Sequence, residues 1–145
     1  MTARETLQEL RIAADELQEL YRIRAGVFDM LTSATTRITP TGTRGTGDVH
    51  RLDVLGEVSD RVDAQIAVLA GMRARALDLI ARLDDSRQRS VLIAYYVNAM
   101  DESGRLRSWE DVAAALHMSR STARRTHAAA LDAVEKMNLN EPAGA

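Results

Sequence analysis

Apolar residues recur at alternating intervals of three and four along the start of the chain, which is the spacing of one face of an α-helix. This pattern predicts a helix from about residue 3 to residue 31, interrupted on its apolar face by Arg24. Thr2 and Glu5 have the spacing of a capping box, which satisfies free backbone amides where a helix begins. The apolar positions are Leu7, Leu10, Ala14, Leu17, Tyr21, Phe28 and Leu31.

The same spacing returns farther along the chain and predicts a second long helix, from Asp48 as a good N-cap to Leu83. The stretch 32–47 between the two helices holds Pro40, three glycines and seven threonines, which predicts a flexible loop. It lacks the preceding strand and the Gly-Lys-Ser/Thr ending of a phosphate-binding loop, so we interpret it as a linker. The second set of apolar positions is Leu52, Leu55, Val58, Val62, Ile66, Leu69, Met72, Ala76, Leu79 and Leu83.

The length of the second helix bears on how the two helices pack. It would measure about 54 Å, whereas a compact globule of this chain length has a diameter of about 40 Å. The two apolar faces would therefore pack on each other as an elongated hairpin, on a second chain, or on both. The predicted arrangement of residues 1–84 is a long antiparallel helical hairpin, like a coiled coil, that also serves oligomerisation. Ala14 and Ala76 allow a close approach of the helices, and a dimer is the first expectation.

From Asp84 onward the pattern predicts shorter helices and a separate domain over residues 85–138. A helix capped within residues 84–86 is expected to run to about Met100, followed by a turn over 101–107. Ser108 stands three residues before Asp111, which again is a capping signature. We expect residues 139–145 to fray. No stretch alternates with period two for the length of a strand, so the predicted fold class is all-α.

Residues 108–134 predict a two-turn helix, a tight turn and a longer helix. Val112, Ala113 and Leu116 would form the inner face of the first helix, and the small Ala113 would allow a close crossing. In the turn, Met118 would fill the core and Ser119 would cap the following helix. The inner face of that helix would be Ala123, Thr126 or His127, Ala130, Leu131 and Val134.

This arrangement leaves a polar, basic surface on the outer face and N-terminal end of the second helix. Such a surface is what a recognition helix presents to the major groove of double-stranded DNA. Arginine can read guanine or clamp phosphate, while serine and threonine serve either target. The candidate DNA-binding residues are Arg120, Ser121, Thr122, Arg124, Arg125, Ala128 and, ahead of the first helix, Arg107.

Three runs within this segment resemble region four of bacterial sigma factors: Ser-Trp-Glu-Asp-Val-Ala from Ser108, Met-Ser-Arg-Ser-Thr from Met118, and Arg-Arg-Thr-His from Arg124. They resemble more closely the small phage and prophage late-transcription regulators of the ArpU/RinA type. The run Asp85-Ser86-Arg87-Gln88-Arg89-Ser90-Val91-Leu92 is similar to the opening of the DNA-binding part in those proteins. The resemblance implies a helix-turn-helix and a sequence-specific DNA-binding regulator.

The sequence departs from that family pattern at three places. His117 occupies the turn position that usually holds glycine, although histidine tolerates a positive φ better than most residues. Thr126 replaces a larger apolar residue. The segment Asp101–Arg107 is longer than the usual turn.

The charge is unevenly distributed along the chain. The chain carries a formal charge of −2, but residues 105–127 hold five arginines against two acids, Glu110 and Asp111, a local net charge of +3. This local excess favours a nucleic acid as the partner of the C-terminal segment.

Several functional classes find no support in the sequence. There are no cysteines, which fits the reducing cytoplasm, and there is no apolar run long enough for a membrane span or signal peptide. The three histidines lie on separate elements without ligand spacing, so we expect no metal and no other cofactor. No nucleophile-and-base arrangement indicates an enzyme. Trp109 is expected to be a structural anchor, and one of Tyr95 and Tyr96 to lie in the core.

Two other functional classes remain open. One is a DNA recognition subunit like the phage small terminase, which also joins such a motif to helical oligomerisation. The other is a helical adaptor, in which the predicted hairpin binds RNA polymerase or another protein.

Overall fold

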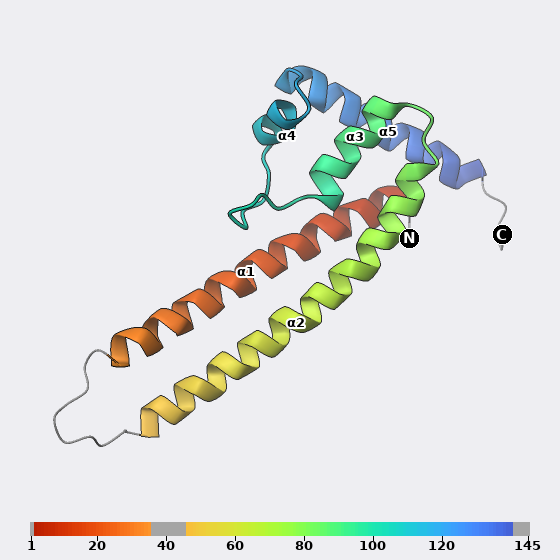
Figure 1. Cartoon of the computed structure of the whole chain (residues 1–145). Coiled ribbons are helices and arrows are strands. Elements are labelled where there is room, and N and C mark those ends of the chain that lie inside the picture. The colour runs from red at the N-terminus through yellow and green to blue at the C-terminus, as the bar shows by residue number, and fades with distance from the viewer. Residues whose placement is uncertain (1, 36–45, 141–145) are drawn as a thin grey trace. The chain divides into compact units, whose positions relative to one another are not determined.

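The structure, a computed structural model, describes residues 2–35 and 46–140, and in this part of the chain every regular element is helical (Figure 1). An isolated antiparallel bridge joins Met100 and Leu106. The predicted all-α class is therefore confirmed. The elements are α1 (Ala3–Thr35), α2 (Thr46–Ala81), α3 (Ser86–Leu92), the π-helix η1 (Ile93–Val97), α4 (Trp109–Ala115) and α5 (Arg120–Asn140).

The chain divides into two compact units. The larger unit combines Met1–Asp15 with Val68–Ala145, and the smaller unit is Glu16–Ala67. This division differs from a boundary near residue 84, because the first turns of α1 and the last turns of α2 belong with the C-terminal helices.

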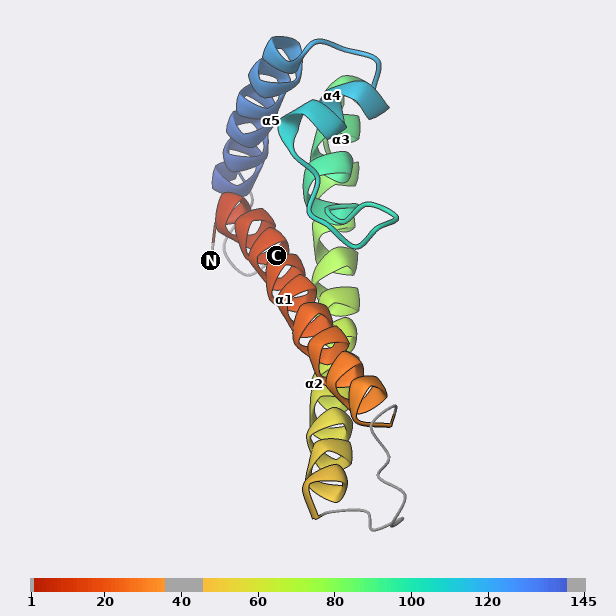
Figure 2. The same ribbon diagram turned by 90° about the vertical axis from the view of Figure 1, so that its left-hand side faces the viewer.

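The core of the larger unit draws side chains from each of its α-helices. Helix α5 contacts both α3 and α4, and the three helices lie together in both views (Figures 1 and 2). Helix α1 contributes two fully buried leucines and α2 a fully buried isoleucine. The largest fully buried side chains of this unit are Leu7, Leu10, Ile80, Val91, Leu92, Val112 and Val134.

Helix starts follow the predicted caps. The Thr2 amide donates to Glu5 Oε2, and the Glu5 amide donates to Thr2 Oγ1, both at 3.1 Å. At α4, the Ser108 amide donates to Asp111 Oδ2 at 2.9 Å, and the Asp111 amide donates to Ser108 Oγ at 3.2 Å. Both predicted capping boxes are therefore confirmed.

Single side chains cap the remaining two helices of the larger unit. Asp85 Oδ1 accepts hydrogen bonds from the amides of Arg87 and Gln88, which makes Asp85 the N-cap among the three candidates. Ser119 Oγ accepts from the Thr122 amide at 3.1 Å, as predicted.

Several helix boundaries differ from the predicted ones. Helix α1 continues past residue 31 to Thr35, where the Thr32 hydroxyl donates to the Phe28 carbonyl at 2.9 Å inside the helix. Helix α2 begins at Thr46 instead of Asp48 and ends at Ala81 instead of Leu83. Of the predicted loop, residues 36–45, with Pro40, lie outside the described residues. Of the predicted tail, residues 139–140 belong to α5, and 141–145 lie outside the described residues.

The apolar face of α2 follows a different register from the predicted one. Ile80, only 1% exposed, takes the core position predicted for Leu79, and Ile66 is 44% exposed. A three-residue step leads from Val62 to Gln65, and a four-residue step leads from Gln65 to the buried Leu69. Gln65 Nε2 donates to Glu16 Oε2 at 3.3 Å. The helical period accommodates both registers, and in the folded chain the polar Gln65 faces α1 where Ile66 was predicted to lie.

The predicted apolar seam is closed only in part within the smaller unit. Leu17, Val58 and Val62 are buried, whereas Phe28 is 59% exposed and Leu52 is 57% exposed. The side chains that would continue the seam toward the end of α1 are thus largely in contact with solvent.

The side chain of Arg11 links α1 to distant residues of the larger unit. The Arg11 guanidinium donates to the Tyr95 carbonyl at 2.7 Å and to the Arg107 carbonyl at 2.6 Å. Its central carbon lies 3.7 Å from the centroid of the Tyr95 ring, in cation–π geometry. Arg11 therefore connects α1, η1 and the segment that precedes α4.

We expect Arg11→Met to lower the free energy of unfolding by about 1.5–3 kcal/mol, because hydrogen bonds from a charged donor contribute that much. Methionine keeps the apolar stem and removes the donors. Arg22→Met is the control, since Arg22 forms an exposed ion pair with Glu19 at 3.4 Å, which should change stability by less than about 1 kcal/mol. Urea unfolding of both variants measures the difference. Equal losses would contradict the assigned role of Arg11.

The crossing of α4 and α5 generates a second prediction. Ala113 is 4% exposed, so Ala113→Leu should overpack the crossing and destabilise the protein by about 1–3 kcal/mol. Ala114 is exposed on the same helix, and Ala114→Leu serves as the matched control with little expected effect. Thermal melts of the two variants compare them, and similar melting temperatures would contradict close packing at Ala113.

Candidate nucleic-acid interface

Helices α4 and α5 are held together by the residues predicted for their inner faces. Val112 and Ala113 of α4 are buried, as are Ala123 and Ala130 of α5. Leu116 and Met118 are only half-buried, so the prediction that Met118 fills the core is not met. The apolar packing therefore comes from the two helices more than from the turn between them.

The turn depends on a left-handed backbone conformation at His117, whose φ is 54°. This conformation was anticipated from the position of His117 in the turn. The Met118 amide then donates to the Ala113 carbonyl at 3.0 Å, and the His117 amide to the Ala114 carbonyl at 3.3 Å. These bonds satisfy carbonyls at the end of α4 and direct the chain toward the start of α5.

The structure brings six of the seven predicted site residues together on the N-terminal half of α5. Thr122 is half-buried, and its hydroxyl accepts a hydrogen bond from Ser119 Oγ at 2.8 Å. Arg107 lies apart from them, in the segment before α4, where its carbonyl accepts from Arg11. The exposed members on α5 are Arg120, Ser121, Arg124, Arg125 and Ala128.

The three arginines of α5 differ in their interactions. Arg120 forms an exposed ion pair with Glu110 at 3.6 Å, which contributes little to stability. Arg125 Nε donates to the Ser121 carbonyl at 3.4 Å, leaving its terminal nitrogens unengaged by described residues. Arg124 makes no hydrogen bond or ion pair with any described residue. Arg124 and Arg125 are thus the cations most available to an anionic partner.

Acidic residues appear on α5 only beyond this basic row. Arg4 of α1 pairs with Asp132 at 3.5 Å and with Glu135 at 3.1 Å. These pairs offset the first two negative charges that follow the arginines along α5. The three arginines of α5 therefore all precede its first acidic residue.

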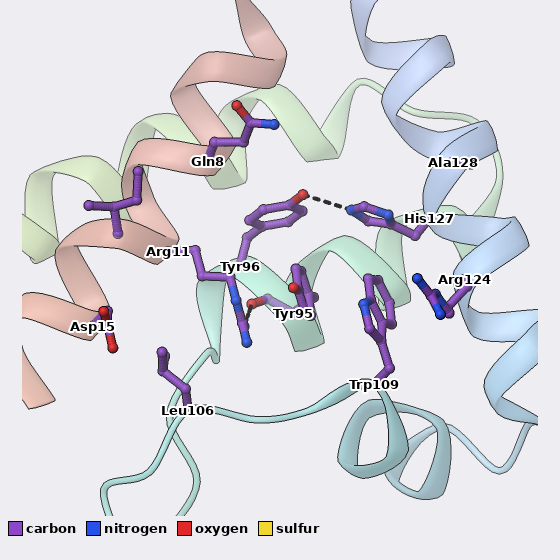
Figure 3. A pocket seen from close by; sticks show the side chains of 11 residues that line it. Gln8, Arg11, Asp15, Tyr95, Tyr96, Leu106, Trp109, Arg124, His127 and Ala128 are labelled. Atoms are coloured by element: carbon purple, nitrogen blue, oxygen red, sulfur yellow. Dashed lines mark hydrogen bonds between the residues drawn. The ribbon is translucent and has the colours of Figure 1, made fainter.

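An aromatic cluster lies beside the basic row and was not anticipated as a unit. Trp109 stacks on Tyr95 with ring centroids 4.1 Å apart and an interplanar angle of 11°. Since Arg11 also lies over the Tyr95 ring, the ring is held between a guanidinium and an indole (Figure 3). Trp109 is therefore packed against Tyr95, as a structural anchor would be. Tyr96 is the core tyrosine, 3% exposed, and Tyr95 is half-buried.

His127 connects this cluster to α5. Its Nε2 lies 2.7 Å from the Tyr96 hydroxyl, and its ring meets Trp109 edge-on with centroids 4.6 Å apart. Burial, followed by the charges of Arg4, Arg11 and Arg124, lowers the pKa of His127 to about 4. Burial first, and the nearby Tyr95 second, raise the pKa of Tyr96 to about 12. Both groups are therefore neutral near pH 7.

The π-helix η1 explains why two consecutive tyrosines join one cluster. The Asn98 amide donates to the Ile93 carbonyl at 2.8 Å, a bond that spans five residues. The wider turn changes the angular spacing of the side chains relative to an α-helix. The sequence pattern predicted a regular helix to Met100 and gave no signal for this change.

Two further properties of the described residues bear on function. They contain no group of three or more potential metal-ligating side chains. No helix among the described ranges is sufficiently long and apolar to span a membrane.

Comparison with protein-family models, with curated proteins and with solved structures finds no significant match to this chain.

The low pKa of His127 predicts a pH dependence of stability. The folded pKa of about 4 lies below the unfolded value of about 6.5, so the unfolded state binds the proton first. Stability should be complete above about pH 6.5 and fall as the pH approaches 4, by roughly 1 kcal/mol at pH 5 after allowance for solvent screening.

This dependence can be measured by urea unfolding at pH 7 and pH 5 for wild type and His127→Gln. The variant should show a smaller loss of stability between the two pH values. An NMR titration of His127 gives its pKa directly, and a value near 6.5 would refute the burial argument.

Proposed function

We propose that this chain is a sequence-specific DNA-binding transcription regulator of the phage or prophage type, in which α4 and α5 act as a helix-turn-helix. The observation that carries the proposal is the exposed row of Arg120, Arg124 and Arg125 on the N-terminal half of α5, without an acid before Asp132. A capped helix start with outward arginines and an apolar inner face is the arrangement that enters the major groove.

Each exposed side chain has a chemical task in this proposal. Arg124 and Arg125 can donate two parallel hydrogen bonds to guanine or to a phosphate. Ser121 can contact either target, and the small Ala128 would allow close approach to a base edge. Arg107 lies on another element and is assigned to the DNA backbone.

We also propose that the chain self-associates, since helix-turn-helix proteins commonly bind paired half-sites as dimers. The smaller unit offers the surface, because its helical segments 16–35 and 46–67 leave several large apolar side chains exposed. We propose that they form a hairpin whose open seam packs on a second copy of the chain. The exposed side chains at the predicted seam positions are Phe28, Leu52 and Ile66, each at least 44% exposed.

Arg124→Ala and Arg125→Ala should weaken DNA binding without lowering the melting temperature. A lost base contact should cost about 1–3 kcal/mol and relax the preference at one position, and a lost phosphate contact should lower the salt slope by about one. The assay is a binding titration at two salt concentrations with a sequence selected from a random pool. Arg75→Ala, an exposed arginine of α2, is the control. Wild-type binding by both α5 variants would refute the recognition-helix assignment.

Light scattering at tens of micromolar should show a dimer, and the double variant Phe28→Gln and Leu52→Gln should shift it toward monomer. Leu77→Gln, which changes an exposed leucine of the larger unit, should leave the dimer intact. A wild-type monomer would contradict the proposed interface. Large ring-shaped oligomers would favour the terminase-like subunit, and absence of DNA binding at low salt would favour the adaptor.

A further inference from the structure

The larger unit contains a cavity of about 750 Å³ between the start of α1 and the N-terminal half of α5 (Figure 3). We call it the aromatic groove. Its floor is formed by Tyr95, Tyr96, Trp109 and His127, and Arg124 lies in its α5 wall. Small-molecule sites typically have volumes of about 300–1,000 Å³, so the groove is large enough for a compact organic ligand.

The floor of the groove offers flat apolar surface. The Tyr96 hydroxyl and His127 Nε2 are hydrogen-bonded to each other, and the Arg11 guanidinium is engaged by two backbone carbonyls. These polar groups already have hydrogen-bond partners and do not need one from a ligand. Trp109 and Arg11 cover the two faces of the Tyr95 ring, so the half-buried Trp109 is the ring of the floor against which another planar ring can pack.

The two walls of the groove differ in charge, with Arg124 on the α5 side and Asp15 on the α1 side. Arg124 makes no hydrogen bond or ion pair with a described residue and is one of three arginines whose charge acts on His127. Asp15, in the α1 wall, is the carboxylate among the lining residues. An anionic group is therefore favoured at Arg124, while a second negative charge near Asp15 is disfavoured.

The backbone beneath the groove is also unusual. Tyr95 and Tyr96 belong to the π-helix η1, and π-helical turns occur frequently at functional sites because they reposition side chains at a cost in regular hydrogen bonding. Here the irregular turn supplies half of the aromatic floor.

From the aromatic floor, the unpartnered guanidinium and the opposing carboxylate, we propose that the aromatic groove binds a small aromatic monocarboxylate. The ring lies against Trp109, and the carboxylate accepts hydrogen bonds from Arg124. This site goes beyond the proposed DNA-binding function. Where that function holds, a bound carboxylate occupies one of the arginines of the recognition helix and would act as an effector.

Trp109 is the single tryptophan of the chain, so its fluorescence reports directly on the groove. The probe is 3-phenylpropionate, with the uncharged 3-phenylpropanamide as its matched compound, titrated into the full-length protein in the absence of DNA. The experiment therefore does not depend on the proposed DNA binding. Arg124→Gln is the test variant, and Arg125→Gln, whose residue does not line the groove, is the matched control.

We expect 3-phenylpropionate to cause a saturable change in Trp109 emission. The affinity should be about tenfold or more lower in Arg124→Gln and for the amide, because each removes a charge-assisted hydrogen bond. Arg125→Gln should bind the probe like wild type. The indole N–H resonance in an NMR spectrum provides a second readout. No saturable response up to about 1 mM, a free energy of only about −4 kcal/mol, would overturn the proposal. Equal binding of acid and amide, or equal weakening by both variants, would overturn it as well.

Discussion

The contact of Arg11 with Tyr95 and Arg107 is the interaction on which the larger unit depends. Carbonyls in the last turn of a helix lack partners within that helix, and the Tyr95 carbonyl lies in the last turn of η1. The Arg107 carbonyl belongs to the extended segment before α4. A single guanidinium from α1 satisfies both acceptors and places a positive charge at a helix C-terminus, where the helix dipole favours it.

The Arg11 contact fixes the position of the aromatic cluster and, through it, the face of α5. With the guanidinium on one side of the Tyr95 ring and Trp109 on the other, the start of α4 is tied to η1. Trp109 in turn contacts His127, which lies on α5 between the inner face and the arginines. The orientation of the basic row is therefore set by rigid ring contacts as well as by the apolar packing of α4 on α5.

Local signals in the sequence were sufficient for much of this structure. The capping boxes, the left-handed His117 and the buried faces of α4 and α5 depend on residues within a few positions of one another, and they were predicted correctly. The register of α2 was missed at Leu79 and Ile80, because a helical pattern permits two nearly equivalent sets of steps. Arg11 could not be anticipated, since its partners lie 84 and 96 residues away.

Helix α1 also affects the distribution of charge around α5. A chain with a net charge of −2 gains nothing from long-range attraction to a polyanion, so a basic surface must be made locally. Arg4 pairs with Asp132 and Glu135, the acids that follow the basic row. Burial first, and then the charges of Arg4, Arg11 and Arg124, lower the pKa of His127, so arginines of both α1 and α5 act on this side chain. Helix α1 thus contributes to the polarity of the proposed recognition surface, as well as to the core beneath it. In the proposed ligand site, the exposed Arg124 in the wall of the aromatic groove supplies the positive charge that favours an anion.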